Sequence, residues 1–209
     1  MSERLYSPGN GLVPDFNRLN PSPTAPTLIG LAGYARSGKD TVAEIVQRLY
    51  GHIVLSFSDI LREFLYAQDL YIPDEKGFAI RLNEVVDAIG WEDARERYQY
   101  IRVLQQKIGQ EAGRETLGQD VWVNAWNNRV LALGGEWVNP SVRYPNEVEA
   151  VRNLGGVVLG VIRPGVGPVN DHLSDRALDG VVLDGLIVND GTLADLEGEV
   201  QRVLGEFGS

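Results

Sequence analysis

The sequence contains no cysteine and only two histidines among its 209 residues. The absence of cysteine excludes disulfides and thiol catalysis, and two histidines leave little for a zinc site. A reducing compartment such as the cytoplasm fits this composition. There is no run of about eighteen apolar residues, and the N-terminus lacks a basic segment followed by an apolar one. The sequence therefore predicts neither a membrane span nor a signal peptide.

Positive charge is also scarce. Nineteen Lys and Arg residues stand against 29 Asp and Glu, which gives a formal net charge of −10. Binding a nucleic-acid polymer needs a broad basic surface, so this balance argues against such a partner. Any phosphate site must therefore be a local cluster of Arg and Lys. The remaining composition, 44% apolar and 23% charged, is typical of a soluble globular chain with room for one α/β domain and insertions.

The stretch from Leu28 to Thr41 carries the strongest motif in the chain. An apolar run leads to a glycine, four variable residues and Gly38-Lys39, and apolar residues then recur at helical spacing. Gly33 and Gly38 let the backbone adopt positive φ, so that successive N–H groups can surround phosphate oxygens at a helix N-terminus. The pattern predicts a phosphate-binding loop for a nucleoside triphosphate, with Lys39 on the β- and γ-phosphates. The alternative is a tight turn with a solvated lysine.

The residue after this lysine departs from the usual pattern. Asp40 stands where Ser or Thr is common, and the hydroxyl comes one place later, at Thr41. Asp40 could hold magnesium through water or cap the start of the helix, and the sequence leaves both interpretations open.

Proline content and periodicity divide the chain into regions. Residues 1–26 hold five of the ten prolines and are predicted to form an extended arm, either ordered on the body or a neighbouring subunit or disordered. Residues 27–209 are predicted to form one α/β domain. Its parts are a core at 27–57 and 134–209, a helical insertion at 58–133 and a lid at about 163–185.

Alternation of strand and helix patterns predicts a parallel sheet, with ligands at the carboxyl ends of its strands. Strands are expected at 27–31, 52–57, 136–139, 157–162 and 186–188. Helices are expected at 39–50, after a Ser58-Asp59 cap, at 78–89, 98–115, 120–133 and 145–154, and after a Thr192–Asp195 cap. The insertion shows no strand pattern.

Arginines in the insertion are the candidates for a second phosphate. Transfer of a phosphoryl group requires positive charge where that group sits, more than it requires a base. Spacings of four, five and three residues place Arg102, Gln106, Glu111 and Arg114 near one helical face. An arginine suits a phosphate, and a glutamine can contact a base edge. A solvated helix face with ion pairs is the alternative, and the spacing does not decide.

Several motifs together resemble the deoxynucleoside monophosphate kinases of bacteriophages. They occur in the same order from about residue 27 to the C-terminus and comprise Gly33–Thr41, Arg102–Arg114, Gly118–Val123, Val142–Glu147 and Asn189–Thr192. The resemblance implies an adenylate-kinase-like, P-loop NTPase-type α/β fold with a parallel sheet, flanking helices, a helical substrate-binding insertion and a short lid. It also implies ATP and a deoxynucleoside monophosphate as substrates, Mg²⁺ as cofactor and a homodimer. If the chain is of phage origin, its compartment would be the host cytoplasm.

The resemblance implies roles for individual residues. The catalytic residues would be Lys39, Arg114, Arg143 and a lid arginine, Arg163 or Arg176. The ATP-binding residues would be Gly33, Arg36, Ser37, Gly38, Lys39, Asp40, Thr41, Asn189 and Gly191. The substrate-binding residues would be Ser58, Asp59, Arg62, Arg102, Gln106, Glu111, Arg114 and Trp122. Magnesium would be held by Asp40 and Thr41, directly or through water.

One departure concerns the metal. Ser141 stands where relatives commonly have an aspartate, so a carboxylate that positions magnesium is missing or supplied by Asp40. The interpretation that follows is ATP-dependent phosphorylation of deoxynucleoside monophosphates to diphosphates. The alternatives are a kinase of another small phosphorylated acceptor, similar to phosphomevalonate, and a nucleotide-binding regulatory ATPase. A GTPase is disfavoured because no Asn-Lys-x-Asp segment occurs.

Overall fold

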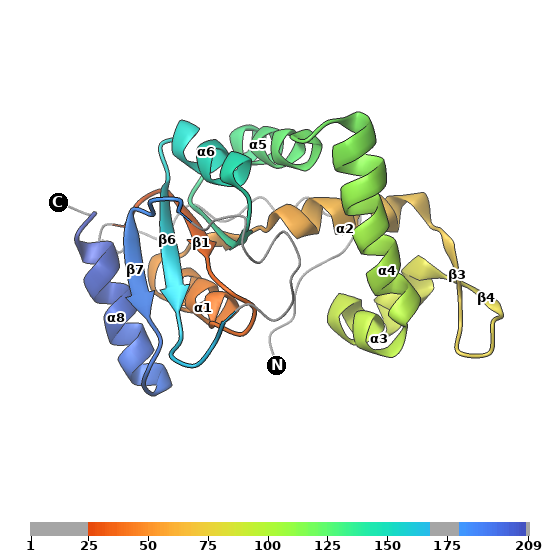
Figure 1. The fold of residues 1–209 in the computed structure, drawn as a ribbon, viewed down its shortest axis with the longest axis horizontal. Coiled ribbons are helices and arrows are strands. Elements are labelled where there is room, and N and C mark those ends of the chain that lie inside the picture. Colours follow the sequence, from red (N-terminus) through yellow and green to blue (C-terminus); the bar gives the residue numbers. More distant parts are fainter. Residues whose placement is uncertain (1–24, 168–179, 208–209) are drawn as a thin grey trace.

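The computed structural model describes residues 25–167 and 180–207. Within this part of the chain, five parallel strands form the central sheet (Figure 1). Their order across the sheet is β2 (Ile53–Val54), β5 (Trp137–Val142), β1 (Leu28–Ala32), β6 (Val157–Ile162) and β7 (Gly185–Val188). All carboxyl ends therefore open at one edge, and the predicted α/β class with a parallel sheet is confirmed.

Strand β1 lies in the middle of the sheet, and all five of its residues are buried. Its side chains alternate between two apolar layers, as the period of a strand requires. Ile29 and Leu31 pack with helices α1 (Lys39–Tyr50) and α8 (Leu193–Gly205) on one face. Leu28 and Ala32 pack with α5 (Val121–Leu133) and α6 (Pro145–Asn153) on the other. Helices on both faces keep the sheet buried and leave the edge with the carboxyl ends as the place for a site.

The chain between β2 and β5 forms a largely helical region beside the sheet (Figure 1). It has its own apolar cluster, which includes Leu65, Leu82 and Ile101. Its elements before α5 are α2 (Phe57–Gln68), β3 (Tyr71–Pro73), β4 (Ala79–Arg81), α3 (Leu82–Arg97), α4 (Gln99–Lys107) and the π-helix η1 (Ile108–Leu117). None of the helices in the described residues is long and apolar enough to cross a membrane.

Several elements match their predicted bounds. Strand β5 runs on to Val142 instead of ending at residue 139, and three larger differences lie between β2 and β5. Helix α1 and strand β6 have the predicted bounds, and α8 begins at the predicted Thr192–Asp195 capping box. The insertion was predicted to lack strands, but β3 and β4 form an antiparallel hairpin. Its turn is closed because the Asp74 carboxylate accepts hydrogen bonds from the main chain of Lys76 and Phe78. Strands of three residues are too short to show a period in the sequence.

The second difference lies at the start of α2. The strand expected at 52–57 shortens to Ile53–Val54, because Ser56 rather than Ser58 caps the helix. The Ser56 hydroxyl accepts from the Asp59 amide at 3.1 Å, and the Asp59 carboxylate accepts from the Ser56 amide at 2.9 Å. This reciprocal pair satisfies two amides that a helix start otherwise leaves open.

The third difference is helix α3, which runs through the predicted gap between 89 and 98. It changes direction at Gly90, whose φ of 77° and ψ of 166° are not helical. The predicted arm lies outside the described residues as far as residue 24, as do residues 168–179 of the predicted lid.

Candidate functional site

The turn between β1 and α1 has the geometry that the motif predicts. Gly33 and Gly38 have φ values of 145° and 102°, and Arg36 also has a positive φ, of 68°. A Cβ at Gly33 would lie 2.4 Å from the carbonyl oxygen of Val161, and one at Gly38 would lie 2.4 Å from Nδ2 of Asn189. Both glycines are therefore required by conformation and by space.

Lys39 begins α1 and extends back over this loop. Its Nζ donates to the carbonyl oxygens of Gly33 at 2.6 Å and Tyr34 at 2.8 Å. The ammonium group thus lies at the loop beside the N-terminus of α1, where the helix dipole favours an anion. A phosphate oxygen could replace these two carbonyls as the acceptor for the ammonium group.

Ser37 lies inside the same loop and is 1% exposed. Among the described residues, nothing bonds its hydroxyl, although buried hydroxyls are nearly always hydrogen-bonded. Asp40 is exposed and Thr41 is half-buried in the first turn of α1. The loop therefore offers the open hydroxyl of Ser37, and the first turn of α1 offers two further oxygen ligands, from Asp40 and Thr41.

Asn189 connects the end of β7 to this loop. Its main-chain N–H donates to Ile162 at 2.7 Å, and its side-chain amide donates to the carbonyl oxygen of Ser37 at 2.9 Å. Asn189 also lines a pocket of about 110 Å³ together with Arg163, Pro164, Asp190 and Gly191. The structure therefore brings three predicted residues, Arg163, Asn189 and Gly191, together beside the loop.

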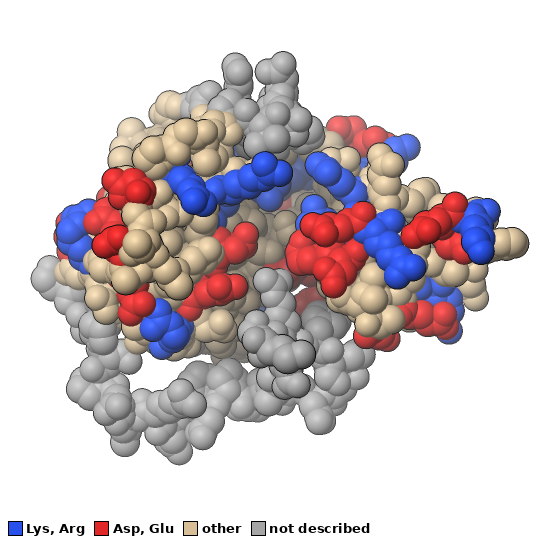
Figure 2. Space-filling model, turned by 90° about the horizontal axis from the view of Figure 1, so that it is seen from below, with Lys and Arg blue, Asp and Glu red and all other residues tan. Residues whose placement is uncertain are grey.

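Four arginines from separate parts of the chain form a second group, which we call the arginine cluster: Arg62 of α2, Arg95 of α3, Arg102 of α4 and Arg143 after β5. Burial lowers the pKa of Arg95, and the charges of Arg62, Arg102 and Arg143 lower it further, while Glu92 opposes them. The charges of Arg62, Arg102 and Arg143 therefore lie within electrostatic range of Arg95, and Arg62 and Arg95 also share the carboxylate of Glu92. Figure 2 shows Lys and Arg side chains gathered across the middle of one face, between the sheet and the helical region.

Two carboxylates partly balance the arginine cluster. Glu92 binds Arg62 at 2.7 Å and Arg95 at 3.4 Å, and Asp59 lies 3.4 Å from Arg62. Nε of Arg95 is buried, and no described residue accepts from it. Four guanidinium groups against two carboxylates leave an excess of positive charge and an open donor. This is a suitable environment for an anion with several oxygens.

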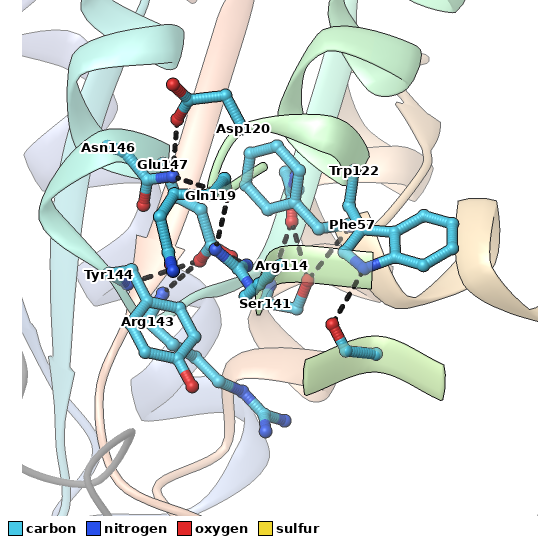
Figure 3. Close-up of polar contacts among 12 residues, drawn as sticks. Phe57, Arg114, Gln119, Asp120, Trp122, Ser141, Arg143, Tyr144, Asn146 and Glu147 are labelled. Atoms are coloured by element: carbon cyan, nitrogen blue, oxygen red, sulfur yellow. Dashed lines mark hydrogen bonds and ion pairs between the residues drawn. The ribbon is translucent and has the colours of Figure 1, made fainter. Parts of the chain in front are cut away.

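Arg114 belongs to a buried network at the start of α6 (Figure 3). It donates to Glu147 at 2.7 Å and to the carbonyl oxygen of Gln119 at 3.0 Å, and its guanidinium lies 4.4 Å from the ring centre of Tyr144. Between Arg102 and Arg114 the helix changes to π geometry at Ile108, so the regular α-helical spacing used in the prediction does not continue to Arg114.

Glu147 is the acceptor at the centre of this network and is 2% exposed. Besides Arg114, it accepts from the main-chain N–H groups of Arg143 at 2.7 Å and Tyr144 at 3.2 Å. Burial raises the pKa of Glu147, and the bonds and the charge from these three residues oppose that rise.

The other predicted substrate residues are dispersed. Trp122 is 8% exposed, and its indole N–H donates to the carbonyl oxygen of Gly109, so it packs η1 against α5. Ser58 is half-buried on α2, whereas Gln106 and Glu111 are exposed. The position of Arg176 lies outside the described residues.

Ser141, which stands where an aspartate was expected from the resemblance, has a structural role. Its hydroxyl accepts from the Phe57 amide at 3.1 Å and donates to the Asn139 side chain at 3.0 Å. It therefore fixes the start of α2 to the end of β5. In the described part of the chain no group of three His, Asp or Glu residues could hold a metal ion.

The sequence argument counted Arg95 only as one of the arginines of the insertion, and it gave Glu92 and Glu147 no role in these networks. Helical spacing relates Glu92 to Arg95, which is three residues away, but only the fold brings them to Arg62. For Glu147 a signal was present, since Pro145 at the start of a helix and an acid two residues later predict a carboxylate near the first amides.

Comparison with known proteins agrees with the motifs. No protein-family model matches the chain. A deoxynucleotide monophosphate kinase of Escherichia phage RB69 is 27% identical over 108 residues, which are 50% of this chain and 44% of that protein. A protein of the same name from Enterobacteria phage T4 is 31% identical over 70 residues, 32% of this chain and 28% of that protein. The matched region thus spans less than half the length of either relative.

Among solved structures, dephospho-CoA kinase from Campylobacter jejuni aligns over 87% of this chain and 97% of its own, with a TM-score of 0.41 and 14% identity. So loose an overlap carries no information about the substrate. The resemblance to bacteriophage deoxynucleoside monophosphate kinases that the motifs predict is confirmed, because the chain is similar to two curated proteins of that kind.

Proposed function

We propose that the protein transfers the γ-phosphoryl group of ATP to the 5′-phosphate of a deoxynucleoside monophosphate, giving ADP and the deoxynucleoside diphosphate. One observation carries this proposal: the phosphate loop and the arginine cluster adjoin. Ala32 pairs with Val142 in neighbouring parallel strands, which lie about 4.8 Å apart. The next residues are Gly33 of the loop and Arg143 of the cluster, so two anion-binding groups leave the sheet side by side.

Two adjacent anion sites are what a transfer between two phosphates requires. The loop amides and Lys39 would hold the β- and γ-phosphates of ATP, and the arginine cluster would hold the acceptor phosphate. The attacking atom is an anionic phosphate oxygen, so no general base is needed. Positioning and neutralisation of charge supply the rate, and Arg143, nearest to the loop, would stabilise the group in transit.

The purine ring of ATP would lie near the pocket beside Asn189. A guanidinium plane such as that of Arg163 can stack on a base, and main-chain groups of Asp190 and Gly191 can contact its edge. The amide of Asn189 is bound to the loop and therefore also fixes the loop beside this pocket.

The residues of the loop fit a magnesium ion. Mg²⁺ prefers oxygen ligands and is commonly held by one or two carboxylates together with substrate phosphates. Asp40 and Thr41 supply a carboxylate and a hydroxyl beside the phosphate position, and Ser37 supplies a hydroxyl that no described residue bonds. When bound, the ion would neutralise charge on the phosphate oxygens.

A substrate screen tests the proposal. ADP release from ATP is measured by a coupled assay with each deoxynucleoside and ribonucleoside monophosphate, and with phosphomevalonate, in turn. We expect ADP release that depends on at least one deoxynucleoside monophosphate and that Lys39→Ala abolishes. Lys76→Ala, on the exposed hairpin turn, is the matched control and should match wild type. Hydrolysis of ATP at one rate with or without any monophosphate would support a regulatory ATPase instead, and release only with phosphomevalonate would select the other kinase.

A further inference from the structure

The network around Glu147 joins three parts of the chain. Glu147 belongs to α6, and its partner Arg114 belongs to η1. The two main-chain N–H groups that donate to Glu147 belong to Arg143 and Tyr144, the residues directly after β5. Asn146 adds a contact to the same junction, because its amide donates to the Asp120 carboxylate at 2.7 Å. The end of the helical region is thereby attached to the end of the sheet (Figure 3).

Arg143 is the residue that this junction positions. Its side chain is exposed and acts on Arg95 in the arginine cluster, whereas its main-chain N–H is held by the buried Glu147 carboxylate. The bond at 2.7 Å fixes the point from which the Arg143 side chain leaves the sheet. The cation of Arg114 compensates the charge that Glu147 brings into the interior.

We propose that Glu147 and Arg114 are positioning residues that hold Arg143 in place for phosphoryl transfer, and that Arg114 does not itself bind the acceptor phosphate. This inference rests on the proposed function and departs from the role that the sequence motif implies for Arg114. Nη1 of Arg114 donates to the carbonyl oxygen of Gln119, and Nη2 donates to the carboxylate of Glu147. The guanidinium group also lies over the ring of Tyr144, and the side chain is 9% exposed. A site for an incoming phosphate needs donors that the protein leaves open, as the arginine cluster does.

Steady-state kinetics with the preferred monophosphate provides the first test. We expect Glu147→Gln and Arg143→Ala each to lower kcat by about 10- to 100-fold, the cost of a misplaced catalytic group, and to leave the KM for ATP within threefold. The double variant should be no slower than Arg143→Ala, because Glu147 acts through Arg143. Multiplicative losses in the double variant would overturn the proposal.

A conservative variant keeps the test valid if Glu147→Gln folds poorly. Arg114→Lys retains the compensating charge, so we expect kcat within fivefold of wild type, whereas Arg114→Met should lose as much as Glu147→Gln. A KM for the monophosphate raised more than tenfold in Arg114→Lys, with kcat unchanged, would show direct contact with the acceptor and contradict the proposal. Glu63→Gln, which breaks an exposed ion pair between α2 and α5, is the matched control.

Binding of inorganic phosphate, followed by calorimetry, separates this inference from the proposed function. We expect Arg143→Ala and Glu147→Gln to weaken phosphate binding by the same factor and Glu63→Gln to leave it unchanged. If wild type binds phosphate in this way but phosphorylates no nucleotide, the proposed function fails and the positioning role stands. If Glu147→Gln binds phosphate as wild type does, the positioning role fails even in an active kinase.

Discussion

The proposed phosphate loop and the arginine cluster present hydrogen-bond donors by different means. The loop is nine consecutive residues, Gly33 to Thr41, and its shape follows from backbone conformation and two glycines that admit no side chain. The arginine cluster draws its guanidinium groups from residues 62, 95, 102 and 143, which only tertiary packing brings together. A site made of main chain is fixed locally, whereas a site made of side chains depends on every element that carries one.

This difference predicts that a single substitution in the loop will abolish most of the activity, whereas a single substitution in the arginine cluster will reduce it only in part. The largest effect is expected for Gly38→Ala, since its Cβ would overlap the Asn189 amide and remove main-chain donors from their positions. We expect kcat/KM to fall by about 10³-fold, the range found when preorganised donors are lost. Gly51→Ala, at the other end of α1 with a similar φ and nothing within 4 Å, should retain activity. Equal losses in the two variants would show that backbone strain alone matters.

Breaking the ion pair beside the cluster should reduce stability. Arg114→Met leaves the Glu147 carboxylate buried without its charge partner, which is expected to lower the free energy of unfolding by about 3 kcal/mol. Urea unfolding measures this. Because burial raises the pKa of Glu147, protonation relieves the unpaired charge, so the deficit should shrink as pH falls and grow as pH rises. A deficit independent of pH would contradict this explanation.

Loss of one member of the arginine cluster should have a smaller, selective effect. Arg95→Ala removes one of four cations, and we expect the KM for the monophosphate to rise by about 10-fold while the KM for ATP stays constant. Arg97→Ala is the matched control on the same helix, since Arg97 is exposed and lies 3.5 Å from Glu75. An equal change in both Michaelis constants would place Arg95 outside the acceptor site.

The smallest effect is expected for the exposed Arg129–Glu63 pair. The two groups lie 2.6 Å apart, but the Arg129 side chain is 44% exposed. Glu63→Gln should change the free energy of unfolding by less than about 1 kcal/mol, because water screens the pair. If Glu63→Gln lowered the free energy of unfolding as much as Arg114→Met does, burial would not explain why the two ion pairs differ in strength.

The sequence predicts the loop well because local rules determine it. Gly38 and Lys39 fix the end of the loop and the start of α1, and the Thr192–Asp195 capping box fixes the start of α8. Strand β6 is a continuous apolar run in which Val and Ile predominate, so its bounds could be predicted from composition. In each case the signal lies within a few residues of the element that it specifies.

The helical region was harder to predict because its structure depends on distant contacts. The register from Arg102 to Arg114 fails at Ile108, where a π-helix that no residue pattern marks replaces the α-helix. Arg114 pairs with Glu147, which is 33 residues away in the sequence. Helix α3, which carries Arg95, also changes direction at Gly90, and sequence spacing cannot show that change.

The fate of the γ-phosphoryl group tests the central claim most directly. ATP labelled in that group is incubated with the protein and each deoxynucleoside monophosphate, and the labelled products are separated. The account predicts that the label appears in a deoxynucleoside diphosphate, in amounts equal to the ADP formed, and that Lys39→Ala abolishes both products. Label found only in inorganic phosphate, at one rate with and without a monophosphate, would contradict it.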